Sequence, residues 1–188
     1  EVGAKIIFER SKIINHLSSI AKNKHLKIAE KSAEREENLK ILYNSGISRE
    51  IIEEYKPEKI KNELFYLLES KSEREIEREM TLYGPHRDDI DFKLDDKDMK
   101  KFSSQGQKRT AVLSLKLAEL ELLKEITGRK PIFLLDDVFS ELDDKRQKAF
   151  LGEINNVQTF ISCVDIDSFK YNKNNSTLFE IKNGSIVL

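Results

Sequence analysis

Ile132-Phe133-Leu134-Leu135-Asp136-Asp137 is the most informative segment of this 188-residue sequence. Its four consecutive apolar residues are typical of a short strand that is apolar on both faces, as the central strands of a parallel sheet are. A helix expected over 144–151 and a strand expected over 158–162 would complete a strand–helix–strand unit. Because ligands bind beyond the carboxyl ends of parallel strands, we expect Asp136 and Asp137 at a ligand-binding edge.

Two adjacent carboxylates at that position suit phosphate chemistry. Mg²⁺ takes oxygen ligands and accompanies nucleotide phosphates, so one carboxylate could hold the ion and the other could orient or deprotonate an attacking water. The alternative is that these aspartates only cap the following helix, which is also the better explanation for Asp143 and Asp144. We expect the strand end to be buried, and two adjacent carboxylates there would be costly without a cation or hydrogen-bond donors, which argues against a purely structural role.

A second motif, Phe102-Ser103-Ser104-Gln105-Gly106-Gln107-Lys108-Arg109, opens a long helix that we expect over about 104–127. Ser104 and Gln107 have the spacing of a capping box, and the helix start is a potential anion site. Gly106 would let the backbone come close to another group. We expect the helix to be buried by its apolar residues Val112, Leu113, Leu115, Leu117, Leu120, Leu123 and Ile126. The alternative to an anion site is an ordinary, well-capped buried helix.

A third motif is Tyr83-Gly84-Pro85-His86-Arg87-Asp88-Asp89, which precedes a half-buried strand expected over 89–94. Its Gly-Pro turn presents a histidine, an arginine and two acids, and it could be a salt-bridged corner and nothing more. The spacing fits no common metal site or catalytic triad. The other histidines, His16 and His25, lie on a charged helix, and we expect both at the surface.

The residues before 80 have a different, mainly helical pattern. We expect a helix over 1–31, a strand over 39–43, and a helical region that is broken near Pro57 and resumes to Leu68. The charged segment 69–79 should face solvent. The far end of the chain, 177–187, is typical of a hairpin. We therefore expect two parts, 1–80 and 81–188.

The composition is that of a soluble, helix-rich globular protein, with 38% hydrophobic and 36% charged residues. The net charge of −1 lacks the overall positive charge that is typical of nucleic-acid-binding proteins, so composition alone leaves DNA binding open. No apolar run is long enough to cross a membrane, and no membrane partner is expected. The single cysteine, Cys163, excludes an internal disulfide and fits a reducing compartment, so we expect a cytoplasmic location.

Taken together and in this order, the motifs resemble the RecF family, the recombination and repair branch of the ABC/SMC-like ATPases. The resemblance is dense over about 80–165 and weaker over 1–79. It rests on four segments: Gly84-Pro85-His86-Arg87-Asp88-Asp89 is similar to a family block of unknown role, Ser103-Ser104-Gln105-Gly106-Gln107 to the ABC signature, Leu134-Leu135-Asp136-Asp137 to Walker B, and Ser140-Glu141-Leu142-Asp143 to the D-loop.

The resemblance implies an α/β fold: the carboxy-terminal part of an ABC-type P-loop ATPase head over 81–188, with a mostly parallel sheet and flanking helices. A helical arm, the second half of the family's lobe II, would precede it over 1–80. The resemblance further implies that Asp136 serves Mg²⁺ and that Asp137 replaces the usual Walker B glutamate as the water-activating carboxylate. Ser104 and Gly106 would face the γ-phosphate of ATP held by a partner subunit.

Two features depart from the ABC pattern. Val164-Asp165 stands where the switch histidine is expected after the strand over 158–162, which leaves the γ-phosphate sensor unidentified. No G-x-x-x-x-G-K-[ST] sequence occurs in these 188 residues, and that loop is what cradles the β- and γ-phosphates. We therefore expect the chain alone to hydrolyse no ATP.

For function, the resemblance implies an ATP-dependent clamp that binds single-stranded, double-stranded and gapped DNA and dimerises on ATP. The family's role is to help load recombinase together with RecR and RecO-type mediators. Two alternatives stay open. One is a structural helical adaptor in which the motifs are relics, and the other is a different SMC-like ATPase, which the His86-Arg87-Asp88-Asp89 block disfavours.

Overall fold

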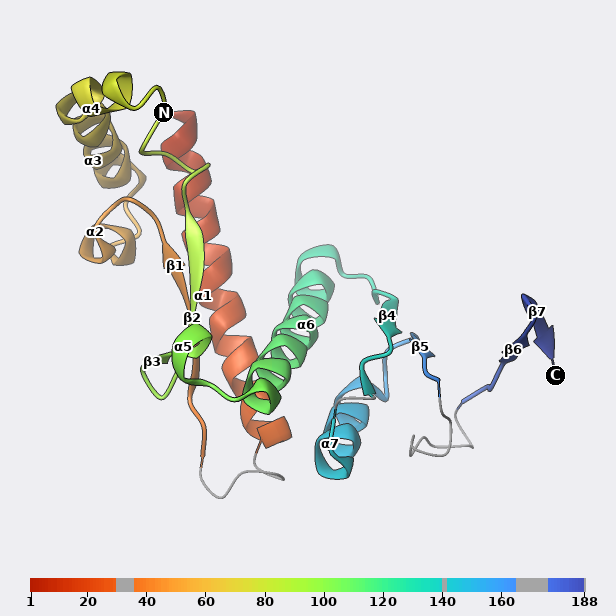
Figure 1. Ribbon diagram of the computed structural model, residues 1–188. Coiled ribbons are helices and arrows are strands. Elements are labelled where there is room, and N and C mark those ends of the chain that lie inside the picture. Colours follow the sequence, from red (N-terminus) through yellow and green to blue (C-terminus); the bar gives the residue numbers. More distant parts are fainter. Residues whose placement is uncertain (30–35, 140–141, 165–175, 188) are drawn as a thin grey trace.

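The computed structural model describes residues 1–29, 36–139, 142–164 and 176–187, in a mixed α/β arrangement (Figure 1). The expected α/β class is confirmed. In chain order the elements are α1 (Val2–Ala29), β1 (Leu39–Asn44), α2 (Arg49–Glu53), α3 (Pro57–Ser70), α4 (Ser72–Glu77), β2 (Asp89–Leu94), β3 (Lys97–Asp98), α5 (Met99–Phe102), α6 (Gln105–Thr127), β4 (Phe133–Asp136), α7 (Asp144–Ile154), β5 (Thr159–Ser162), β6 (Glu180–Lys182) and β7 (Ser185–Val187).

Helix α1 is the longest helix described and contributes to all three apolar clusters. Its 28 residues correspond to a length of about 42 Å. Along that length it contributes to three apolar clusters: Ile7 packs with α2 and α3, Ile14 and Ala21 pack with β1 and α6, and Ile28 packs with β4 and α7. Helix α1 therefore runs from the cluster with α2 and α3 to the cluster with β4 and α7 (Figure 1).

An antiparallel sheet of order β1-β2-β3 lies against α1. Leu39 pairs with Leu94 and Asn44 pairs with Asp89, so the register is continuous along all of β1 and β2. The two strands come from either side of residue 80 in the sequence. The division into 1–80 and 81–188 stays a prediction. The backbone hydrogen bonds between β1 and β2 join these two parts of the chain.

Helix α6 packs along α1 and is less buried than expected. Leu113 and Leu117 are buried, in line with the expectation from the sequence. In contrast, the expectation was wrong for Val112, Leu123 and Ile126, which are 55%, 49% and 65% exposed. The helix has one covered face, which packs against α1 and against the cluster that contains β4 and α7, and a second apolar face that the described residues leave open.

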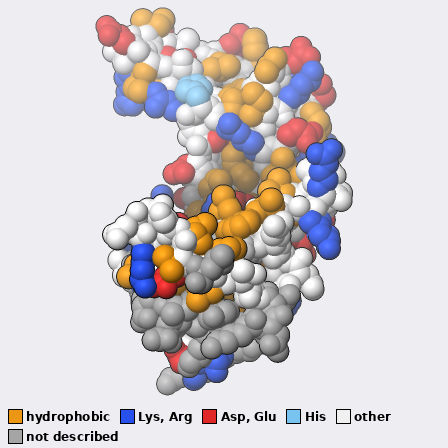
Figure 2. All heavy atoms as spheres, turned by 90° about the vertical axis from the view of Figure 1, so that its right-hand side faces the viewer, with side chains coloured by type: hydrophobic (Ala, Val, Ile, Leu, Met, Phe, Trp, Pro, Cys, Tyr) orange, Lys and Arg blue, Asp and Glu red, His pale blue; other side chains and the backbone are white. Residues whose placement is uncertain are grey.

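Strands β4 and β5 pair in parallel, with Phe133 opposite Thr159 and Asp136 opposite Ser162. Phe133 and Leu135 face the cluster that contains Phe150 of α7. Leu134 is 72% exposed on the opposite face, so the expected burial of β4 on both faces was wrong for the residues described. The two-stranded sheet has one covered face, and Figure 2, which views this side of the molecule, shows hydrophobic side chains gathered in a hollow.

The expected hairpin near the end of the chain is present as β6 and β7, which pair with Ile181 opposite Ile186. Both strands are exposed along their length. Across the described ranges, none of the helices has the length and apolar character needed to span a membrane.

Candidate functional site

The carboxyl end of β4 presents the two expected carboxylates. The Ser162 hydroxyl at the end of β5 donates a hydrogen bond to Asp136 Oδ1 and accepts one from the backbone N–H of Asp137 at 3.1 Å. Asp137 has a φ of +46°, in the left-handed region that non-glycine residues seldom adopt. Ser162 therefore holds the turn after β4 and fixes one carboxylate oxygen of Asp136.

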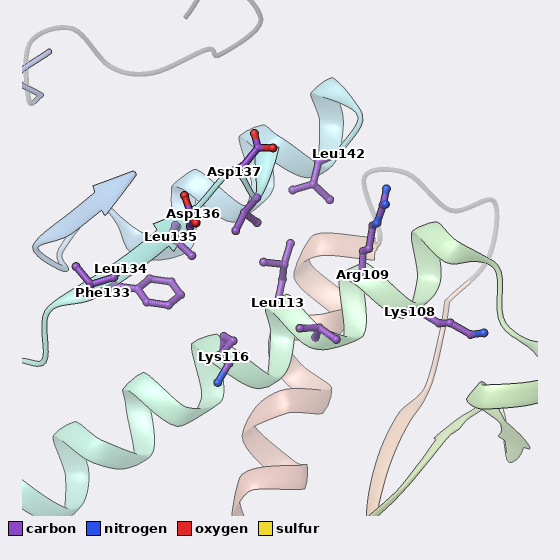
Figure 3. Close-up of a pocket in the computed structure, with 12 residues that line it drawn as sticks. Lys108, Arg109, Leu113, Lys116, Phe133, Leu134, Leu135, Asp136, Asp137 and Leu142 are labelled. Carbon is purple, nitrogen blue, oxygen red and sulfur yellow. The ribbon is translucent and has the colours of Figure 1, made fainter. Parts of the chain in front are cut away.

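A pocket of about 440 Å³ lies between this strand end and helix α6 (Figure 3). Its wall is largely apolar and includes Leu113, Phe133 and Leu142, which Figure 3 shows facing the gap between the two elements. Its rim is charged and consists of Lys108, Arg109, Lys116, Asp136 and Asp137. The pocket thus joins the second turn of the signature-like helix to the paired aspartates.

Asp136 and Asp137 are both exposed. The expectation of a costly, buried pair of carboxylates was therefore wrong, because solvent reaches both groups. Their donor chemistry still fits Mg²⁺: Ser162 occupies only Oδ1 of Asp136, and Mg²⁺ is commonly held by one or two carboxylates together with phosphate oxygens and water. Within the described ranges, no group of three or more His, Cys, Asp or Glu side chains is placed to hold a metal ion.

The start of α6 has the expected capping box. The backbone N–H of Gln107 donates to Ser104 Oγ at 3.2 Å, and the N–H of Ser104 donates to Gln107 Oε1 at 2.9 Å. Ser104 and Gln105 are exposed, whereas Ser103 is half-buried. The cap therefore orders the signature-like turn while one side of it stays open to solvent.

Gly106 approaches an arginine. A β-carbon at this position would lie 2.7 Å from Nη1 of Arg146, which is near the start of α7. Arg146 in turn pairs with Asp143 at 3.3 Å, and Asp143 caps α7 by accepting from the backbone N–H groups of Lys145 and Arg146. The expectation that Asp143 is a helix cap is confirmed.

Of the D-loop-like segment, Leu142 is buried in the cluster around Phe150, while Ser140 and Glu141 lie outside the described residues. Val164, in the place expected for a switch histidine, is 95% exposed, and Asp165 also lies outside them. Arg146 was missed by sequence reasoning. It joins the D-loop-like segment to the signature-like turn, and no spacing in the sequence indicates that contact.

His25 was expected at the surface and is completely buried. Its Nε2 lies 3.0 Å from Oε2 of Glu37, whose other oxygen accepts from Gln107 Nε2 at 2.7 Å. Burial lowers the pKa of His25, against the opposing effect of Glu37. Glu37 is also buried, and its part in the site was not foreseen.

The block Gly84–Asp89 contacts the opposite end of α1. Arg10 donates to the Pro85 carbonyl and lies 3.4 Å from Asp88 Oδ2, which also accepts from the Tyr43 hydroxyl. The Asp88 side chain is only 3% exposed, whereas His86 and Arg87 are exposed. Asp89 is exposed and accepts from the N–H of Ile90. These contacts favour the interpretation of Gly84–Asp89 as a salt-bridged corner. None of its residues lines the pocket between β4 and α6.

No protein-family model matches the chain. Curated relatives from several organisms do match it, and they bear the name DNA replication and repair protein RecF. The protein of Acetivibrio thermocellus is 44% identical over 170 residues, which cover 90% of this chain and 44% of the relative. That of Limosilactobacillus reuteri is 41% identical, covering 98% and 48%, and that of Staphylococcus carnosus is 40% identical, covering 100% and 50%. The chain spans about half the length of these relatives.

Among the solved structures that are similar to the chain are two of RecF. One is described as the recombination mediator protein RecF-ATPrS in the RecFOR pathway, with a TM-score of 0.75 and 36% identity. The other, described as RecF-ATP in the same pathway, has a TM-score of 0.69 and 38% identity. Each match covers 98% of this chain and 46% of the solved chain. The similarity extends over residues 1–80 as well as over the motifs.

Proposed function

Because this chain is a homologue of about half of RecF, we propose that it supplies the signature and Walker B part of an ATP-dependent DNA-binding clamp. The observation that carries this proposal is the match over nearly the whole chain to a RecF structure described with ATP. In this proposal 81–188 belong to the ATPase head and 1–80 belong to the arm. ATP closes a homodimer on gapped, single-stranded or double-stranded DNA, in a pathway that includes RecR and RecO-type mediators and leads to the loading of recombinase.

The open apolar face supports a head that is completed by further protein. Leu134 and Phe160 on the sheet and Val112 on α6 are all more than half exposed, and leaving such a surface in water is unfavourable. A parallel sheet is normally covered on both faces. We propose that the rest of a RecF-length polypeptide covers this face and supplies the phosphate-cradling loop.

Within such a head, each residue has a proposed part. Asp136 holds Mg²⁺ through the oxygen that Ser162 leaves unoccupied, and Asp137 accepts a proton from the attacking water. Bound Mg²⁺ offsets the negative charge of the phosphates. Ser104 and Gly106, with the N–H groups of the first turn of α6, face the γ-phosphate of the nucleotide on the partner subunit.

Comparing the chain with the full-length protein tests this proposal. By full-length protein we mean a polypeptide that carries this chain and has the length of its RecF relatives. We expect ATP hydrolysis in the full-length protein, slow but dependent on Mg²⁺, and none above background in the chain alone. Equal rates for the two would contradict the proposal, and so would a full-length protein that neither binds ATP nor dimerises with it, as a structural adaptor would behave.

A further inference from the structure

A buried chain of polar side chains runs from helix α1 to the first turn of α6. His25 is fully buried and Glu37 is 5% exposed. Glu37 lies 3.0 Å from His25 Nε2 through one oxygen and 2.7 Å from Gln107 Nε2 through the other. Gln107 lies 70 positions from Glu37 in the sequence, and the contacts of these three residues connect α1 directly to the signature-like turn.

Hydrogen-bond chemistry fixes the direction of the two contacts that Glu37 makes. An ionised carboxylate only accepts, so the proton on the His25 ring belongs on Nε2, and Gln107 donates through its amide nitrogen. His25 Nδ1 faces the hydroxyl of Ser114 at 3.4 Å, and that hydroxyl donates to the Thr110 carbonyl at 2.6 Å. Both oxygens of Glu37 are therefore engaged, as a buried carboxylate requires.

The side-chain amide of Gln107 is held from two sides. Its oxygen accepts from the Ser104 N–H, and its nitrogen donates to Glu37. Since the amide is planar, the position of Glu37 sets the orientation in which Gln107 caps the helix. A glutamate at 107 would form the capping box equally well, but it could not donate to Glu37. The contact with Glu37 therefore explains why position 107 carries a glutamine and not a glutamate.

We propose that Glu37 is a positioning residue for the signature motif, coupling α1 through His25 and Gln107 to the turn that contains Ser104. This inference rests on the proposed function, because the turn it positions is the one assigned to the γ-phosphate. Movement of the arm relative to the head would shift that turn through these hydrogen bonds. Binding of the phosphate at the turn would in return shift α1.

A swap of donor and acceptor tests the proposal. In the full-length protein, Gln107→Glu keeps the cap but sets two carboxylates against each other. We expect the concentration of a non-hydrolysable ATP analogue that gives half-maximal dimerisation, followed by light scattering, to rise by roughly tenfold, equivalent to about 1.4 kcal/mol. Adding Glu37→Gln restores the pair, because the new amide donates to the new carboxylate and its oxygen accepts from His25. The double variant should return to within about twofold of wild type.

Gln158→Glu is the matched control, because it makes the same change at an exposed site between α7 and β5. Amide hydrogen exchange in the first turn of α6 without nucleotide gives a second readout. It should accelerate in Gln107→Glu and recover in the double variant. The inference would be overturned if Gln107→Glu changed neither the exchange rate nor dimerisation. It would also be overturned if the double variant did not restore them. A wild-type protein that fails to dimerise with the analogue would instead contradict the proposed function, and the exchange series would still decide the role of Glu37.

Discussion

A β-carbon added to Gly106 would lie 2.7 Å from Nη1 of Arg146, so the guanidinium of Arg146 occupies the space into which a side chain at position 106 would project. Arg146 is held in that position by Asp143 of the D-loop-like segment. In the described part of the chain its Nε is buried without a hydrogen-bond partner. Two motifs that are 37 positions apart in the sequence thus meet through an arginine that belongs to neither.

This contact makes the effect of Gly106→Ala depend on Arg146. Alanine in a helix interior is more favourable than glycine by about 0.5–1 kcal/mol, and we expect a gain of the same sign in the first turn. With Arg146 present, the new methyl group displaces the guanidinium from Asp143, and we expect that gain to be cancelled or reversed. With Arg146→Ala as the background, the gain should reappear. Thermal melts of the four full-length proteins measure this cycle, and additive effects would show that the two residues do not interact.

The paired aspartates should fail in different ways when each is changed to asparagine. Asp137→Asn preserves size and tolerates the positive φ, but it cannot accept a proton, so hydrolysis should fall at least a hundredfold while ATP binding changes little. Asp136→Asn should instead weaken Mg²⁺-dependent ATP binding. Single-turnover hydrolysis and equilibrium binding with and without Mg²⁺ separate the two. Equal loss of binding in both variants would refute this division of roles.

The contact between Tyr43 and Asp88 should make stability sensitive to alkaline pH. Burial, together with the hydrogen bond to Asp88, raises the pKa of the Tyr43 hydroxyl above its ordinary value of 10. A raised pKa in the folded state contributes stability that is complete below pH 10 and is lost as the pH rises further. Between pH 9 and 11, the free energy of unfolding should fall more steeply for wild type than for Tyr43→Phe, measured by chemical denaturation. Parallel pH profiles would count against this contact.

Local chemistry made parts of the fold predictable. The capping box at Ser104 and Gln107 depends on side chains three residues apart, and the strand of β4 depends on a run of apolar residues, so both could be identified from the sequence. Asp143 as a cap is of the same kind. Each of these features is determined within one turn or one strand.

Long-range contacts could not be predicted in this way. His25 has charged neighbours in the sequence, yet it is buried because α6 covers it and Glu37 accepts from it. Leu134 is exposed because no described element packs on its side of the sheet, and the apolar run that indicates a strand carries no information on that packing. The contact of Arg146 with Gly106 likewise arises only when α6 and α7 pack together.

The central claim is that Ser104 lies at a nucleotide-dependent dimer interface and is more than a helix cap. As a cap alone, Ser104→Ala would cost about 1 kcal/mol of stability, and dimerisation would change only as stability does. In the clamp, Ser104→Arg places a bulky side chain in the exposed, signature-like turn. ATP binding to the same subunit would remain, but closure on the partner would not.

The most direct measurement is light scattering of the full-length protein with a non-hydrolysable ATP analogue, wild type against Ser104→Arg, with thermal melts as the control for folding. We expect wild type to form a dimer that depends on the analogue. Ser104→Arg should remain a monomer under the same conditions, with a melting temperature within a few degrees of wild type and unchanged binding of the analogue. A well-folded Ser104→Arg protein that still dimerises with the analogue as wild type does would contradict the account.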